Sequence, residues 1–170
     1  MSDWHGKRSC ILACGNVLFG DDGFGPAVAR SCIRDCTIPA DVCVYDAGTS
    51  VRNILFDILL SEERPSHIVI IDAMDVGREP GELFSLDLDA MPGKKTDDFS
   101  MHQIPTSNLL RELRDLCGVT ITILACQVAH IPTGVSPGLS RPVSEAVPRA
   151  VELLAREHGV RRSPHAAVTR

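Results

Sequence analysis

The sequence predicts an α/β fold in three layers: an open, twisted sheet of about five strands, mostly parallel with one antiparallel edge strand, and helices on both faces. Short apolar runs rich in β-branched residues alternate with segments whose apolar residues recur at helical spacing, as expected for parallel strands joined by helices. Two strand candidates follow each other with no helix between them. So short a connection favours an antiparallel pair, with one strand at an edge of the sheet.

The individual elements follow from the local pattern. The run HIVII at residues 67–71 is the most strongly β-branched, and we expect it to be the central parallel strand. ELFSLDL at residues 82–88 alternates polar and apolar residues, which suits a half-buried edge strand. The predicted strands are residues 10–14, 41–45, 67–71, 82–88 and 119–126. The predicted helices begin at Pro26, span residues 51–60, run from a cap at Thr106 or Ser107 to about residue 116, and span residues 140–156.

Bulk composition is that of an ordinary globular protein. The chain has 170 residues, 44% of them hydrophobic and 23% charged, with a formal net charge of -5. We expect a single α/β domain at residues 9–158 between flexible ends at residues 1–8 and 159–170. An acidic chain without a large basic cluster does not favour binding to nucleic acid or to an anionic membrane. With no membrane-length apolar stretch and no signal-peptide core, the expected location is the cytoplasm.

The cysteines are interpreted as structural. The chain has seven of them, with no C-x-x-C pair, and most lie in apolar runs. This pattern is typical of buried, small hydrophobic side chains in a reducing compartment rather than of a redox or zinc site.

The stretch CILACGNVLFGDDGFG, residues 10–25, is expected to organise the fold. A strand ends near Gly15, and two adjacent carboxylates, Asp21 and Asp22, precede the next helix. The turn matches neither the dinucleotide-binding nor the P-loop pattern and lacks a lysine, so a phosphate site is disfavoured. Carboxylates held on a rigid turn beside backbone N–H groups suit a cation. The alternative is that Asp21 caps the helix and Asp22 faces water.

Other polar groups are expected at the same edge. Asn16 with Asp22, Asp46 and Asp72 each follow a predicted parallel strand, and ligands bind beyond the carboxyl ends of such strands. Two carboxylates, Asp22 and Asp72, with the imidazole of His102 would make a metal site of three ligands with open positions. Each residue has a simpler explanation, since Asp72 could form a turn and His102 could be an exposed loop residue.

The sequence also resembles a known family. The segments GNVLFGDDGFGP, DAGTS, IVIIDAMDVGREPGEL and SMHQIP occur in the order and spacing of the hydrogenase maturation endopeptidases, and the resemblance covers residues 10 to 154. The DDG motif and the segment CQVAHIPTGVSPGLSRPV are most similar to the branches that serve formate-linked and deazaflavin-reducing hydrogenases.

The resemblance implies an aspartic-type or metal-dependent endopeptidase on a twisted α/β sheet. Its catalytic and metal-binding residues would be Asp22, Asp72 and His102, although some relatives carry Glu at the position of Asp22. The implied metal is Ni²⁺, shared with or supplied by the substrate. That substrate would be a [NiFe] hydrogenase large-subunit precursor, bound transiently by a monomer and trimmed at its C-terminal extension after nickel insertion.

Two other functions remain open. A non-catalytic nickel or precursor chaperone could use the same crevice, and a hydrolase or phosphorylase of small metabolites could use a similar sheet. The chain has no G-x-S-x-G elbow, no H-E-x-x-H and no evident Cys/His dyad, which disfavours serine, zinc and cysteine protease mechanisms.

Overall fold

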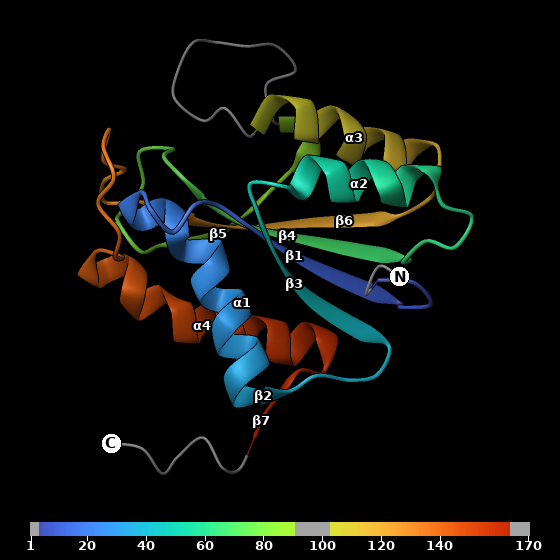
Figure 1. The fold of residues 1–170 in the computed structure, drawn as a ribbon, viewed down its shortest axis with the longest axis horizontal. Helices are drawn as coiled ribbons and strands as arrows, with labels where there is room; N and C mark the ends of the chain where they lie inside the picture. The colour runs from blue at the N-terminus through green and yellow to red at the C-terminus, as the bar shows by residue number, and fades with distance from the viewer. Residues whose placement is uncertain (1–3, 91–102, 164–170) are drawn as a thin grey trace.

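The computed structural model describes residues 4–90 and 103–163. Within them, a five-stranded sheet has the strand order β3-β1-β4-β6-β5 (Figure 1). Neighbouring strands are parallel from β3 to β6, and β5 is antiparallel to β6. The predicted mixed sheet with one antiparallel edge strand is confirmed. The strands are β1 (Ser9–Cys14), β3 (Val42–Gly48), β4 (His67–Met74), β5 (Leu83–Leu86) and β6 (Thr120–Gln127).

The β-branched run at residues 67–71 lies at the centre of the sheet in β4, as predicted. The strand is longer than expected, because pairing with β6 continues from His67 to Met74. Asp72 therefore lies within β4, opposite Ala125, rather than after the strand. Asp46 likewise lies within β3 and not in a turn after it.

Two helices cover each face of the sheet, which gives the predicted three layers (Figure 1). On one face lie α1 (Phe24–Asp35) and α4 (Arg141–His158), and on the other α2 (Val51–Leu60) and α3 (Gln103–Asp115). The predicted start of α3 at Thr106 or Ser107 is wrong, since the helix already includes Gln103. Pro105 falls in the first turn, where a missing N–H costs no intrahelical hydrogen bond. Ser107 is a buried residue inside the helix.

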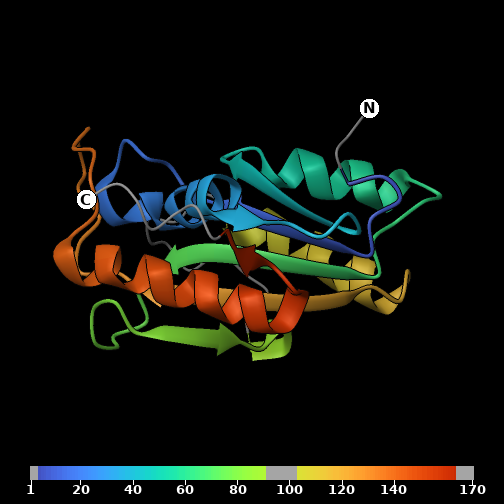
Figure 2. The same cartoon turned by 90° about the horizontal axis from the view of Figure 1, so that it is seen from below.

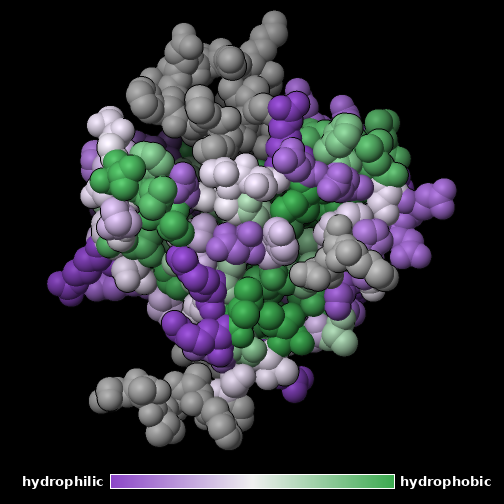
Figure 3. Space-filling view, in the orientation of Figure 1, coloured by the Kyte–Doolittle hydropathy of each residue, from purple (hydrophilic) through white to green (hydrophobic). Residues whose placement is uncertain are grey.

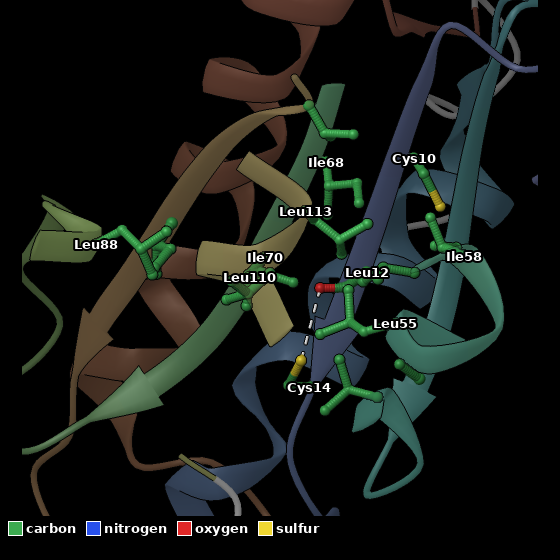
Figure 4. Close-up of a cluster of buried hydrophobic side chains, with 14 of the residues drawn as sticks. Cys10, Leu12, Cys14, Leu55, Ile58, Ile68, Ile70, Leu88, Leu110 and Leu113 are labelled. Atoms are coloured by element: carbon green, nitrogen blue, oxygen red, sulfur yellow. Dashed lines mark hydrogen bonds between the residues drawn. The ribbon is translucent and has the colours of Figure 1, made fainter. Parts of the chain in front are cut away.

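The strands divide the core into two clusters with the period of two that a pleated strand imposes. In β1, Cys10, Leu12 and Cys14 face α2 and α3 (Figure 4). Ile11 and Ala13 point to the opposite face, toward α1 and α4. All five are buried, and each large aliphatic side chain buried in this way contributes about 1.5–3 kcal/mol. Burial on both faces is why the run reads as continuously apolar.

The cysteines are free thiols, and all except the half-buried Cys117 are buried, which confirms the structural interpretation. Two short strands that the sequence pattern did not indicate, β2 (Cys36–Thr37) and β7 (Arg161–Arg162), pair antiparallel beyond α4. Two short 3₁₀ helices, η1 (Gly20–Gly23) and η2 (Leu88–Ala90), complete the described elements. No helix in residues 4–90 and 103–163 is long and apolar enough to cross a bilayer.

Candidate active site

The turn between β1 and α1 doubles back on itself so tightly that it needs glycine at two positions. Gly15 has φ +125°, and a Cβ there would collide with the backbone carbonyl of Asp22. At Gly25, a Cβ would collide with the carbonyl of Cys14 and come 2.8 Å from that of Ile71. The start of α1 therefore lies directly against the ends of β1 and β4. This close approach brings Asp22 to the carboxyl edge of the sheet.

Asp22 is oriented by the same turn. Its Oδ2 accepts a hydrogen bond from the backbone N–H of Asn16 at 2.7 Å, and its own N–H donates to the carbonyl of Phe19 at 3.2 Å. Asn16 Oδ1 in turn accepts from the N–H of Leu18 at 3.0 Å. The Asp22 side chain is half-buried. The alternative in which Asp22 merely faces water does not describe this anchored carboxylate.

Asp72 projects from β4 beside it. Its Oδ1 accepts a hydrogen bond from the N–H of Ala73 at 2.9 Å. Burial raises the pKa of Asp72 to about 7; the Ala73 hydrogen bond lowers it, and the negative charge of Asp22 raises it further. Near neutral pH this carboxyl group is thus divided between its protonated and ionised forms, whereas an isolated aspartate would be fully ionised.

The thiol of Cys14 lies among the carboxylates. Burial raises its pKa, and the charges of Asp72, Asp22 and Asp46 raise it further. The three acids thus lie close enough to Cys14 to affect it, and their predicted convergence at one edge of the sheet is confirmed. Because the thiolate is the nucleophilic form, a thiol held neutral in this way is a poor nucleophile.

The third predicted ligand, His102, lies outside the described residues. Gln103, the residue after it in the chain, begins α3. In β4, Ile68, Ile70 and Met74 face the cluster that includes α3, and the alternation of the strand gives Asp72 the same side. In residues 4–90 and 103–163, no group of three or more His, Cys, Asp or Glu side chains could hold a metal ion.

Asp21, next to Asp22, has a different role. Its side chain is 1% exposed, and Oδ2 accepts from the N–H groups of Ala129 at 2.8 Å and His130 at 3.2 Å. Ser140 donates twice, from its N–H to Oδ1 at 2.6 Å and from its hydroxyl to Oδ2 at 2.9 Å. Ser140 is the N-cap of α4, so Asp21 satisfies the start of that helix rather than of α1.

Comparison with known proteins identifies the family. A family model described as hydrogenase maturation protease matches residues 26–157. The chain belongs to the hydrogenase maturation protease family. A Methanocaldococcus jannaschii protein whose name places it among the hydrogenase maturation proteases is 35% identical over 149 residues, covering 87% of this chain and 94% of the relative. The coenzyme F420 hydrogenase subunit delta of Methanothermobacter thermautotrophicus is 33% identical over 154 residues, covering 88% and 94%.

Solved structures of the family share the fold. The crystal structure of the hydrogenase 3 maturation protease superposes with a TM-score of 0.69 at 27% identity, covering 86% of this chain and 88% of that one. The family predicted from the four sequence segments is therefore confirmed, and with it the membership of a peptidase family.

Two polar residues that support the edge of this hydrogenase maturation protease were missed from the sequence. The sequence allows Asp21 to be a cation ligand or a cap for its own helix, whereas its hydrogen-bond partners lie more than a hundred positions away. Gln127 lies one residue beyond the predicted strand at residues 119–126, but it is the last residue of β6 and is buried. Its Oε1 accepts from Val76 and Arg78, and its Nε2 donates to Asp75 and Val128. In the sequence, the only signal for this role is the position of Gln127 directly after the apolar run at residues 123–126.

Proposed function

We propose that this protein is a nickel-dependent endopeptidase that removes the C-terminal extension of a [NiFe] hydrogenase large-subunit precursor. The observation that carries the proposal is the pair of carboxylates, Asp22 and Asp72, held at adjacent strand ends close enough for one to raise the pKa of the other. Membership of the maturation protease family supports the peptidase activity. The relatives are named for hydrogenases or their maturation, which supports a hydrogenase precursor as substrate.

The two described acids would supply part of a site for a divalent cation. Two acids that share a partly buried site destabilise each other's ionised form, and a bound cation relieves that repulsion. Asp22, Asp72 and the imidazole of His102 would hold it, with positions left open for substrate groups. When bound, the metal supplies a Lewis acid that polarises a carbonyl or activates a water. Oxygen and imidazole ligands without a thiolate are comparatively hard, so the ion could be held mainly by the substrate.

The protein's own groups have separate tasks. The Asn16 N–H binds Oδ2 of Asp22. This hydrogen bond fixes the plane of the carboxylate and with it the direction of Oδ1. Ala73 engages Oδ1 of Asp72, and Oδ2 is the oxygen that can hold a proton. Burial and the charge of Asp22 raise the pKa of Asp72 to about 7 in the metal-free protein, and a bound cation would favour its ionised form. A carboxylate at this site could act as the general base toward a water.

The test is processing itself. The purified protein is incubated with a molar excess of large-subunit precursor, either nickel-loaded or nickel-free. The mass of the intact precursor is then measured by mass spectrometry. Loss of a short C-terminal peptide from the nickel-loaded precursor alone is expected. Asp22→Asn and Asp72→Asn should each reduce turnover at least about 100-fold, the range of general acid–base catalysis. Asp57→Asn, at an exposed site on α2, is the matched control and should process normally.

The outcomes distinguish the competing functions. Binding of the precursor without any loss of mass would refute the endopeptidase and favour the nickel or precursor chaperone. Normal processing by both Asn variants would remove the carboxylate pair from the mechanism. A phosphorylase would need an anion pocket at the strand ends, and the three acids found there, Asp22, Asp46 and Asp72, oppose one.

A further inference from the structure

Beside the carboxylates, two loops expose apolar side chains together. We call residues 17–20 and 129–138 the paired loops. The N–H of Ser136 donates to the carbonyl of Leu18 at 2.8 Å, and the N–H of Gly20 donates to the carbonyl of Ser136 at 2.9 Å. The two loops lie side by side in both views (Figures 1 and 2). Their exposed large apolar side chains are Val17 (37%), Leu18 (45%), Ile131 (37%) and Val135 (70%), in the region where Figure 3 shows apolar surface on that side of the molecule.

The paired loops have a fixed shape although they are exposed. The buried carboxylate of Asp21 accepts two hydrogen bonds from the N–H groups of Ala129 and His130. Gly20 has φ +57°, and a Cβ there would come 2.8 Å from Cδ of Pro132. The loops are therefore joined by backbone, by a buried acid and by a contact that only glycine permits. A surface ordered in advance loses less conformational entropy when a partner binds.

The chemistry of the paired loops differs from that of the adjacent site. Residues 15–20 and 128–140 contain no Asp, Glu, Lys or Arg, and His130 is their one ionisable side chain. The acids Asp22, Asp46 and Asp72 instead gather around Cys14 at the end of β1. The two surfaces adjoin, since Oδ2 of Asp22 accepts a hydrogen bond from the N–H of Asn16, the residue before the first loop, and a Cβ on Gly23, the residue after Asp22, would come 3.2 Å from Cα of Val17. A partner that spans both would place a cation on the acids and an uncharged chain on the loops.

We propose that the paired loops bind an uncharged, apolar stretch of the precursor polypeptide next to the bond that is cut. This inference rests on the proposed function, because it assigns the substrate contact of the same site. Exposed apolar patches on globular proteins mark interaction surfaces, and loops carried by a rigid scaffold commonly supply them. The continuity with the acids selects the polypeptide flanking the cleavage site as the occupant.

The experiment introduces a charge at the most exposed positions, Leu18→Asp and Val135→Asp. Each should raise KM for processing about tenfold or more, the equivalent of about 1.4 kcal/mol of lost binding, with kcat unchanged. Leu116→Asp is the matched control. Leu116 is 79% exposed but lies just before β6, at the amino ends of the parallel strands, whereas the paired loops lie at their carboxyl ends. It should leave KM and kcat unchanged. Thermal unfolding of all three variants confirms that they fold.

Binding of the precursor to the Asp72→Asn protein is measured in parallel, with and without Leu18→Asp. If the wild type does not process the precursor, but binding occurs and Leu18→Asp abolishes it, the docking surface stands while the endopeptidase fails. If processing occurs and both charge variants keep the wild-type KM, the docking surface is refuted and the endopeptidase stands. Sedimentation velocity tests a second copy as occupant: a wild-type dimer that Val135→Asp converts to monomer would overturn the proposal.

Discussion

Replacing Asp21 by Asn should destabilise the protein substantially, although the two side chains have nearly the same shape. The carboxylate accepts four hydrogen bonds, three at Oδ2 and one at Oδ1. The amide of Asn must place its NH₂ toward at least one donor. Its best orientation keeps the three bonds at the Oδ2 position and turns the NH₂ toward the N–H of Ser140, which then has no acceptor.

The magnitude follows from these bonds. An unsatisfied buried donor costs about 1–3 kcal/mol, and a hydrogen bond to a charged acceptor is worth about 1 kcal/mol more than one to a neutral acceptor. Release of the buried negative charge offsets part of the loss. The free energy of unfolding should therefore fall by about 2–4 kcal/mol. Ser140→Ala, which removes only the hydroxyl donor, should cost about 1 kcal/mol.

Urea denaturation followed by Trp fluorescence measures both values, because Trp4 is the single tryptophan and is buried. Hydrogen exchange provides a local reading: in the Asn variant the amides of Ala129, His130 and Ser140 should lose protection before those of β4 do. A change of less than about 0.5 kcal/mol for Asp21→Asn, the range of ordinary surface substitutions, would refute the assignment of this carboxylate as the anchor of the paired loops.

Two further predictions concern the turn and the opposite edge of the sheet. Gly15→Ala should displace the backbone of Asp22, because the new Cβ collides with its carbonyl. The rate of processing should fall by more than the loss of stability measured in urea can explain. Equal kcat in variant and wild type would contradict this prediction. Burial lowers the pKa of His158 below its ordinary 6.5, and the nearby His67 lowers it further. The unfolded chain then binds more protons than the folded one as pH falls from 6.5 toward that lowered pKa. The contribution of His158 to the free energy of unfolding is therefore fully present above pH 6.5 and is lost as pH falls below it. His158→Leu should flatten this part of the stability profile relative to wild type, since neither ring nitrogen of His158 has a hydrogen-bond partner among the described residues; parallel profiles would argue against the assignment.

Much of the fold could be predicted because its strands are marked by composition. HIVII predicted the central strand correctly, since β-branched residues buried on both faces leave a continuous apolar run. The end of that strand could not be predicted, because Asp72 and Ala73 carry no strand signal and are held by pairing with β6. The two-residue strands β2 and β7 are likewise too short to leave a pattern.

The candidate site was partly predictable for the same reason. The carboxyl-end rule brought Asp22, Asp46 and Asp72 together from the strand assignments alone. It could not separate the roles of Asp21 and Asp22. These two residues are identical and adjacent, and only the folded turn determines where each side chain points. Nor could it find the partners of Asp21, since hydrogen bonds to Ala129 and Ser140 depend on tertiary structure and not on local sequence.

The link between Asp21 and Ser140 spans 119 positions, and this separation affects when the protein can become active during its synthesis. A nascent chain that has emerged only as far as β6 already contains both Asp22 and Asp72. It still lacks Ser140 at the N-terminus of α4, which donates hydrogen bonds to Asp21. Contacts between such distant positions form late, because closing a long segment is entropically costly. A ribosome-bound fragment should therefore be unable to cut its target, and shortening the gene before codon 140 should remove activity completely rather than by degrees.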